Sequence, residues 1–303
     1  MYIEYTAEGL RMKTLIVYGI IVGCALSVGV AGGVIYKRMS GEEVDYGDFD
    51  ANALELDAAQ TLASYEKYNG YNPQEKFTPA ELITIGLEKY RRCEYSYSVG
   101  LGVAETVVDQ SIRNFQIRNG DDYFEESISK SDMVKLADRV TQHGQDGDIV
   151  IYRGEAKTDE VGSYPLEGKT YDQQSYIDYL GKTLNQMFIY IISNVTVIDG
   201  NVEKTSDGYN INVELSPDYA TFHYKYQMLN ISGLDELPVF NYVKLHYTFD
   251  KDMMLKTLSV DEEYKAKMGI KVNIKNKIDY KYFPNQKMEI PKLDKPIDYS
   301  IGR

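Results

Sequence analysis

Cysteine and histidine are scarce in this sequence, which limits the bonds that can hold its fold together. Only two cysteines occur among the 303 residues, and one of them, Cys24, lies within a long apolar run. A disulfide framework is therefore excluded, and a chain of this length can bury a core without one. The histidines lack metal-ligand spacing to one another or to a cysteine, so we expect no metal site. The three histidines are His143, His223 and His246.

Motifs of the common enzyme classes are also missing. The chain contains no Gly-x-Ser-x-Gly elbow, no phosphate-binding glycine loop and no dinucleotide-binding fingerprint. Neighbouring carboxylates such as Glu125 and Glu126 point to opposite faces of a strand, so they cannot flank one substrate. We therefore expect no catalytic residue, no cofactor and no enzymatic activity.

Positive charge is in short supply. The chain has 33 Lys and Arg residues against 46 Asp and Glu residues, for a net charge of −13. An acidic surface of this size repels polyanions, so we expect no nucleic-acid partner. Tryptophan is absent, whereas tyrosine is abundant, with 28 Tyr against 9 Phe. Tyrosine favours strands and the wet edges of aromatic surfaces.

One segment, from Thr14 to Tyr36, contains no charged residue. A helix that rises about 1.5 Å per residue is long enough over this segment to cross a hydrocarbon core of about 30 Å. Two basic residues lie just before it and two just after it, so the positive-inside rule does not decide its orientation. Because the bulk of the chain follows it, we predict a single-pass cell-membrane anchor at 14–36, with residues 1–13 in the cytoplasm and the rest extracytoplasmic.

A lipoprotein signal is the alternative interpretation of the same segment. Ile21-Val22-Gly23-Cys24 resembles a bacterial lipobox, in which the cysteine is lipidated after cleavage and becomes the new N-terminus. Against lipidation of Cys24, apolar sequence continues well beyond this residue, where a lipoprotein normally turns polar. Both interpretations tether the chain to the outer side of a membrane.

Residues 37–77 are predicted to form an acidic stalk. The stretch 42–57 is rich in Asp and Glu without a basic residue, and such a segment is solvated and extended by its own charge. The folded domain is expected at 78–285. It opens at Thr78, where a capping box and a following proline predict a helix. Residues 286–303 remain as a C-terminal tail.

Alternating apolar and polar residues predict strands along the domain. A second capping box at Thr170 and an N-cap at Ser216 predict two further helices. The first strand, after Cys93, has one bulky face and one very small face. The small face consists of Ser96, Ser98, Gly100, Gly102 and Ala104. Further strands are expected at roughly 107–118, 122–129, 134–142, 148–156, 187–199 and 209–215.

The clearest alternation runs from Ile270 to Tyr282, with lysines on one face and a single exception, Asn276, on the apolar face. At about 3.3 Å per residue this strand would be roughly 40 Å long. The stretches 243–249 and 258–266 alternate similarly and complete an antiparallel meander. Strands of this length are expected to twist and coil strongly. The sequence thus predicts an α+β fold, a large curved antiparallel sheet (a half-barrel) packed on a few short helices.

An opening helix, long antiparallel strands, inserted helices and a closing three-strand meander resemble the LolA-like half-β-barrel superfamily of bacterial envelope lipoproteins. The resemblance covers about Thr78–Phe283 and is one of pattern, because the superfamily has no invariant catalytic motif to compare. It implies a concave face that holds acyl chains or a hydrophobic partner. It implies no particular ligand residue.

Two functions are compatible with these features. The first is a membrane-anchored extracytoplasmic binding protein that holds a lipid or a hydrophobic or lipidated partner, with the small face of the first strand leaving room for a lipid chain. Close packing of a helix on the same face is the alternative role for these residues. The second function is a structural part of a bacterial envelope, conjugation or secretion complex, with protein partners and cystatin-like outside domains. Two similar α+β halves, near 78–160 and 170–283, would favour it.

Overall fold

The computed structural model describes residues 54–106, 109–132, 135–157, 162–180, 184, 190–232, 234–268, 270–293, 295, 297 and 299–302. The predicted anchor at 14–36, including Cys24, lies outside these residues, as does the predicted stalk before residue 54. Among the helices that the structure describes, none is both long and apolar enough to span a membrane.

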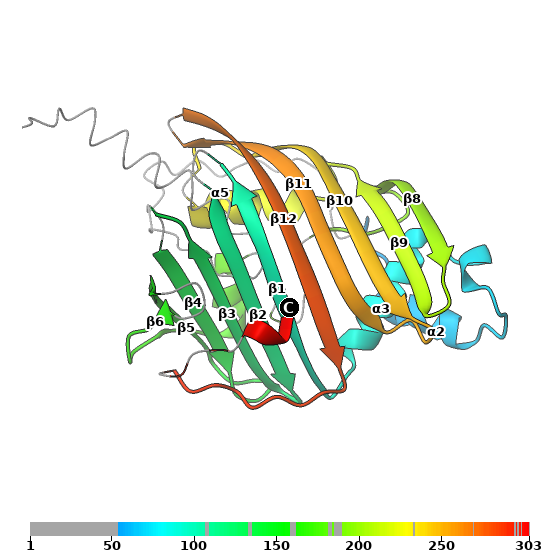
Figure 1. The fold of residues 1–303 in the computed structure, drawn as a ribbon, viewed down its shortest axis with the longest axis horizontal. Helices are drawn as coiled ribbons and strands as arrows, with labels where there is room; N and C mark the ends of the chain where they lie inside the picture. The colour runs from blue at the N-terminus through cyan, green and yellow to red at the C-terminus, as the bar shows by residue number, and fades with distance from the viewer. Residues whose placement is uncertain are drawn as a thin grey trace, which may run out of the picture.

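One antiparallel sheet of 12 strands dominates the fold (Figure 1). Its strands follow the order β6-β5-β4-β3-β2-β1-β12-β11-β10-β9-β8, and β7 pairs with β5 beside this path. The strands are β1 Tyr95–Glu105, β2 Gln110–Asn119, β3 Asp122–Lys130, β4 Lys135–Gln142, β5 Ile149–Ala156, β6 Gly162–Ser163, β7 Lys169–Tyr171, β8 Val197–Lys204, β9 Gly208–Leu215, β10 Val239–Asp250, β11 Leu255–Met268 and β12 Ile270–Pro284.

Two meanders meet in the middle of this sheet. The first runs outward from β1, the second runs inward to β12, and β1 pairs antiparallel with β12 from Ser96↔Pro284 to Glu105↔Lys275. The first and the last long strand of the domain are therefore neighbours. The predicted closing meander forms as expected, with β10 pairing to β11 and β11 to β12.

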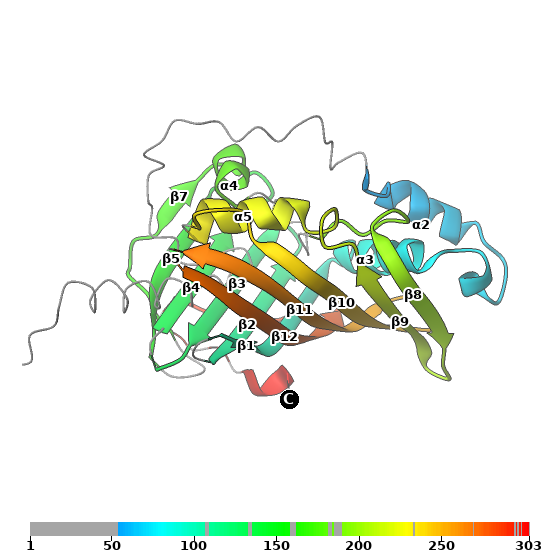
Figure 2. The same ribbon diagram turned by 90° about the horizontal axis from the view of Figure 1, so that it is seen from above.

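The α-helices that the structure describes lie on one face of the sheet, here called the helix face, and the C-terminal segment (residues 286–303), which includes η3, crosses the opposite face, here called the tail face (Figure 2). The α+β class that the sequence predicts, a large antiparallel sheet with a few short helices, is confirmed. The helical segments are α2 Ala58–Glu66, η2 Pro73–Glu75, α3 Pro79–Arg91, α4 Gln173–Leu180, α5 Phe222–Ser232 and η3 Tyr299–Gly302.

Helix α3 begins where the sequence predicts it. The Thr78 hydroxyl accepts a hydrogen bond from the Glu81 amide, the Glu81 carboxylate accepts one from the Thr78 amide, and Pro79 is the first helical residue. Helix α4 begins later than predicted, because Thr170 belongs to β7. Asp172 caps α4 instead, with its carboxylate accepting a hydrogen bond from the Ser175 amide at 2.7 Å.

The strand predicted at 187–199 is largely wrong, since β8 starts only at Val197. Before it, hydroxyl groups make local bonds that compete with strand pairing. The Thr196 hydroxyl donates to the Ile191 carbonyl at 2.6 Å and accepts from the Ser193 amide at 2.9 Å. This segment also connects to the turn before α5, because the Ile191 amide donates to the Ala220 carbonyl.

Residues of α2 and η2 lie in the part of the chain that the sequence assigns to the stalk, and they pack on the domain. Leu62 is buried, and Phe77 belongs to the same core. The rings of Tyr65 and Tyr68 contact Phe77 at centroid distances of 5.8 and 5.7 Å. Packing against the sheet and α3 therefore begins well before Thr78.

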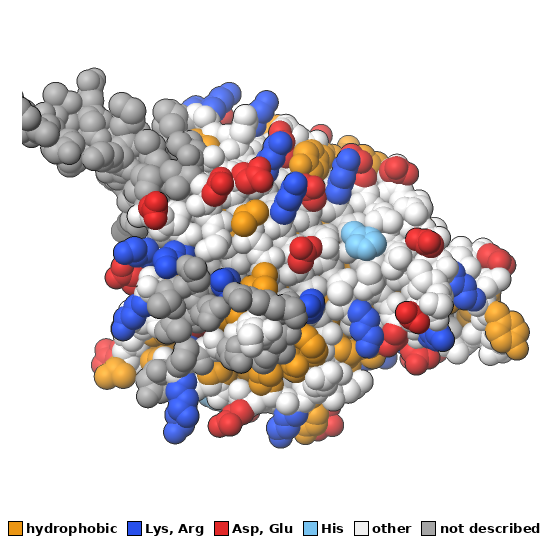
Figure 3. Space-filling view, in the orientation of Figure 1, with side chains coloured by type: hydrophobic (Ala, Val, Ile, Leu, Met, Phe, Trp, Pro, Cys, Tyr) orange, Lys and Arg blue, Asp and Glu red, His pale blue; other side chains and the backbone are white. Residues whose placement is uncertain are grey.

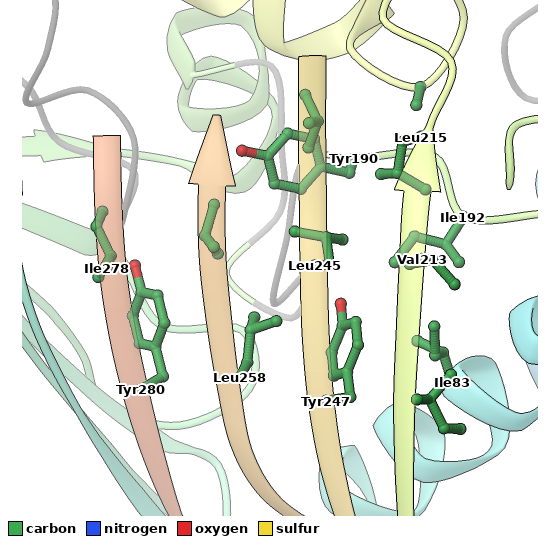
Figure 4. Packing of buried hydrophobic residues seen from close by; sticks show 14 of the residues in the cluster. Ile83, Tyr190, Ile192, Val213, Leu215, Leu245, Tyr247, Leu258, Ile278 and Tyr280 are labelled. Atoms are coloured by element: carbon green, nitrogen blue, oxygen red, sulfur yellow. The ribbon is translucent and has the colours of Figure 1, made fainter. Parts of the chain in front are cut away.

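Three clusters of buried side chains hold the layers together. The largest joins β8–β12 to α2, α3 and α5 on the helix face, and Figure 4 shows side chains of it, such as Tyr247, Leu258 and Tyr280, pointing to the same side of their strands. A second, smaller cluster joins β3–β5 to α4 through Tyr176. The third lies on the tail face of β1–β5 and includes Tyr299 of η3.

The predicted alternation of the last strand is confirmed. Residues 274, 276, 278, 280 and 282 are buried on the helix face, whereas the intervening lysines are exposed. Figure 3 accordingly shows Lys, Arg, Asp and Glu side chains over β10–β12, and apolar side chains gathered beside the C-terminal segment. One half of the tail face is thus wet, and the other half is covered.

The sheet is not strongly curled, and the expectation of a strongly coiled sheet is wrong in this respect (Figures 1 and 2). The physical reason is that the apolar residues on each face already have partners. Helices bury the apolar residues of β8–β12, and the C-terminal segment buries those on the tail face of β1–β4. A sheet covered in this way need not close on itself to hide apolar surface.

Candidate functional site

A strip of small and polar side chains lies on the helix face between the two clusters that hold the helices. Register brings its members together: Gly100, Asn114, Ser127 and Asp138 lie opposite one another on successive strands. We call this group the polar strip. It consists of Ser96, Ser98, Gly100, Gly102 and Ala104 of β1, Asn114, Gln116 and Arg118 of β2, Glu125 and Ser127 of β3, and Asp138 of β4.

The small face that the sequence predicts on β1 forms the edge of the polar strip toward β12. Gly100 lies opposite Tyr280, and a Cβ atom added to Gly100 would lie 2.5 Å from Cε1 of the Tyr280 ring. Ser98 lies opposite Tyr282, whose ring contacts Tyr90 of α3 edge-on at 5.1 Å. The small residues therefore leave room for tyrosine rings that lean across from β12.

An ion pair between buried Asp138 and partly exposed Arg153 closes the strip on the side of β5. Asp138 accepts a hydrogen bond from Nε of Arg153 at 2.9 Å, and its side chain is only 2% exposed. Burial raises the pKa of Asp138 to about 6, although the Arg153 charge opposes this shift. This carboxylate therefore has its own cation.

Glu125, in the middle of the strip, is held by a short chain of hydrogen bonds. The Gln116 amide donates to the Tyr123 hydroxyl at 2.8 Å, and this hydroxyl donates to the Glu125 carboxylate. Burial, followed by the neighbouring Glu125 charge, raises the pKa of Tyr123 well above its ordinary value. The hydroxyl thus stays protonated and remains a donor.

Arg118 is the unusual member of the strip. Its residue is 8% exposed, yet within the described part of the chain its guanidinium makes a single hydrogen bond, from Nη2 to the Leu184 carbonyl at 2.8 Å. It also lies over the Tyr123 ring at 5.7 Å. No carboxylate of the residues described in the structure lies within ion-pair distance of it, and its Nε has no hydrogen-bond partner. Burial lowers the pKa of Arg118.

A second buried polar group lies in the large cluster. Glu262 accepts hydrogen bonds from the Asn276 amide at 3.0 Å and from the Tyr190 hydroxyl. Burial raises the pKa of Glu262 to about 8, and the hydrogen bond from Tyr190 partly opposes this. Asn276 is the one exception in the predicted alternation of β12, and Glu262 occupies the matching apolar position of β11. A polar residue on each of two otherwise apolar strand faces, Glu262 and Asn276, is the sequence signal that could have revealed this buried pair.

A third group fastens the C-terminal segment to the tail face. Arg139 and Glu126 form a fully buried ion pair at 2.6 Å. The hydroxyls of Tyr164 and Tyr299 donate to Glu126 at 2.7 and 3.0 Å. The remaining nitrogens of Arg139 donate to the main-chain carbonyls of residues 292, 293 and 295 at 2.7–2.9 Å. Sequence reasoning missed this group, because main-chain acceptors leave no trace in residue type.

The histidines lie apart from these groups. His143 is near Asp122, His223 is near Glu55, and His246 contacts the Asn212 side chain at 2.5 Å. Within the described ranges no three His, Cys, Asp or Glu side chains are grouped so that they could hold a metal ion.

No protein-family model matches the chain, and no curated protein matches it either.

Proposed function

We propose that this chain is a membrane-anchored extracytoplasmic binding protein, which holds a lipid or another hydrophobic or lipidated partner between its sheet and its helices without turnover. The tether is supported by the charge-free segment from Thr14 to Tyr36. The alternative tether, lipidation of Cys24, leads to the same side of the membrane.

The observation that carries this proposal is the position of the polar strip between two apolar clusters. On one side lie Ile112 and the residues of β9–β12, and on the other lie Val140, Ile149 and Tyr176. An amphiphile needs apolar walls for its chain and hydrogen-bonding groups for its head. The helix face offers both within a few strands.

A LolA-like relationship is part of the same proposal. Two features support it: a single large antiparallel sheet, and helices confined to one face of that sheet. The weak curl of the sheet is a departure from a half-barrel. We infer that the helices and the C-terminal segment take over the burial that stronger curvature would otherwise provide.

The role as a structural part of an envelope complex rests on a division into two similar halves. The pairing of β1 with β12 makes both meanders parts of one sheet, so no observation favours this second function. Crosslinking that recovers several membrane-protein partners in stoichiometric amounts would support it over ligand carriage.

Native mass spectrometry of the full chain, extracted in a mild uncharged detergent, tests the binding role. We expect part of the protein to carry added mass that matches acyl-chain lipids. Ser98→Phe adds a bulky ring to the polar strip, opposite Tyr282, and should abolish the adduct. Ser259→Phe, on the exposed tail face of β11, is the matched control and should retain it. A wild-type chain that never takes up lipid, even when lipid is supplied, would remove the proposal.

A further inference from the structure

A guanidinium buried without a carboxylate partner is costly, because its lost hydration has to be replaced. Arg118 offers five donors, and only Nη2 is used among the described residues. The two carboxylates nearest to it in the polar strip already have donors of their own. Asp138 is paired with Arg153, and Glu125 accepts from Tyr123.

Further unused donors accompany Arg118. The side-chain amide nitrogen of Asn114 and the hydroxyl of Tyr176 are both buried, and neither has a hydrogen-bond partner among the residues that the structure describes. Asn114 and Arg118 are four residues apart on β2, so they point to the same face at a distance of about 13 Å. Tyr176 comes from α4 and belongs to the same buried cluster as Tyr123, whose hydroxyl donates to Glu125 of the strip. Buried donors that no described residue uses, one of them charged, favour an acceptor with negative charge.

We propose that Arg118 binds the anionic group, a carboxylate or a phosphate, of the ligand held on the helix face, and that Asn114 and Tyr176 provide hydrogen bonds further along the strip. This inference rests on the proposed binding function, and it names the chemical class of the ligand. Fork-shaped hydrogen bonding of guanidinium to carboxylate or phosphate is the geometry for which arginine is suited.

The test compares two probes on the full chain in uncharged detergent: a dansyl-labelled long-chain carboxylate, and the methyl ester of the same molecule. Fluorescence titration should show the carboxylate binding about tenfold tighter than the ester, as expected for one charge-assisted contact in a buried site. Inorganic phosphate and acetate are added as competitors. If the ligand is an amphiphile, they compete only weakly, whereas strong competition would indicate that the site recognises a small soluble anion.

Three variants assign the effect to Arg118. Arg118→Gln should bring carboxylate affinity down to that of the ester, and Arg118→Lys should restore part of the difference. Arg113→Gln is the matched control on the same strand, because Arg113 lies on the tail face over Tyr299. Thermal unfolding of each variant checks its fold. If Arg118→Gln does not fold, the comparison of the two probes on the wild type still tests whether the site prefers a negatively charged group.

The outcomes separate the two proposals. Equal affinity of the wild type for both probes would overturn the role of Arg118 and leave the binding function standing. An unchanged preference in a folded Arg118→Gln protein would do the same. Failure of both probes to bind would overturn the binding function and the inference with it.

Discussion

At the scale of single residues, Glu262 and Asn276 interrupt the apolar faces of β11 and β12, and their side chains form a hydrogen bond with each other. They face each other across β11 and β12, and both are fully buried. A polar side chain at such a position is stable only with a partner, and each of the two provides the other with one. The Tyr190 hydroxyl adds a further donor from the segment before β8.

The raised pKa of Glu262 makes stability depend on pH. Its pKa is about 8 in the folded protein and about 4.5 when unfolded. Between these values only the folded state keeps the proton, so the free energy of unfolding should fall as the pH rises from about 4.5 to about 8. Glu262→Gln removes this titration and should flatten the curve relative to the wild type. Urea unfolding at several pH values measures it.

Glu263→Gln is the matched control for this prediction. Hydrogen bonds from Asn241 and Lys275 lower the pKa of Glu263, so its titration lies below the same window and its removal should leave the slope unchanged. Asp138 contributes in the same direction as Glu262, up to about pH 6, in all three proteins. A Glu262→Gln slope equal to that of the wild type would contradict the prediction.

Gly100 has no side chain, and this leaves room for the ring of its cross-strand neighbour Tyr280. A Cβ atom there would lie 2.5 Å from the buried Tyr280 ring. Gly100→Ala should therefore destabilise the domain by about 1–3 kcal/mol, the usual cost of overpacking. Chemical denaturation measures the loss. Tyr280→Leu in the same protein should recover part of it, and a neutral Gly100→Ala would show that the ring is not fixed.

At the scale of elements, the C-terminal segment is a structural cover of the sheet. It brings Ile297 and Tyr299 into the cluster on the tail face, and it provides the carbonyls that satisfy Arg139. Deleting residues 286–303 exposes this cluster and leaves part of a buried guanidinium without acceptors. We expect a loss of several kcal/mol in unfolding free energy, since each buried large apolar side chain contributes about 1.5–3 kcal/mol.

Unfolding in urea, together with binding of a dye that reports exposed apolar surface, checks the deletion. Lys292→Ala is the control, because Lys292 contributes its main-chain carbonyl to Arg139 and its side chain is exposed. This variant should unfold like the wild type. A deleted chain as stable as the intact one would show that the segment is dispensable.

At the scale of the whole molecule, the apolar segment near the N-terminus, with the bulk of the chain after it, predicts one orientation. A membrane-impermeant amine reagent, added to intact cells, should label the exposed lysines of β12, such as Lys271 and Lys281. Lys13, which precedes the predicted anchor, should remain unlabelled until the membrane is opened. Peptide mapping by mass spectrometry gives both results at once, and it also distinguishes an uncleaved N-terminus from a lipidated Cys24. The reverse labelling pattern would contradict the predicted topology.

What the sequence determined by itself is local in character. Alternation along β12 fixed which side chains are buried, because successive residues of a strand point to opposite faces whatever the strand pairs with. The capping box at Thr78 fixed the start of α3, because all of its partners lie within one turn. The small face of β1 was evident for the same reason.

Only the tertiary structure decided which of these faces meet. The pairing of β1 with β12 joins residues that are far apart in sequence, and no local pattern specifies it. The cover of the tail face depends on main-chain carbonyls. That no carboxylate of the described residues pairs with Arg118 depends on the other partners those carboxylates have, such as Arg153 for Asp138. Contacts of this kind follow from the whole arrangement of strands, so residue types alone do not reveal them.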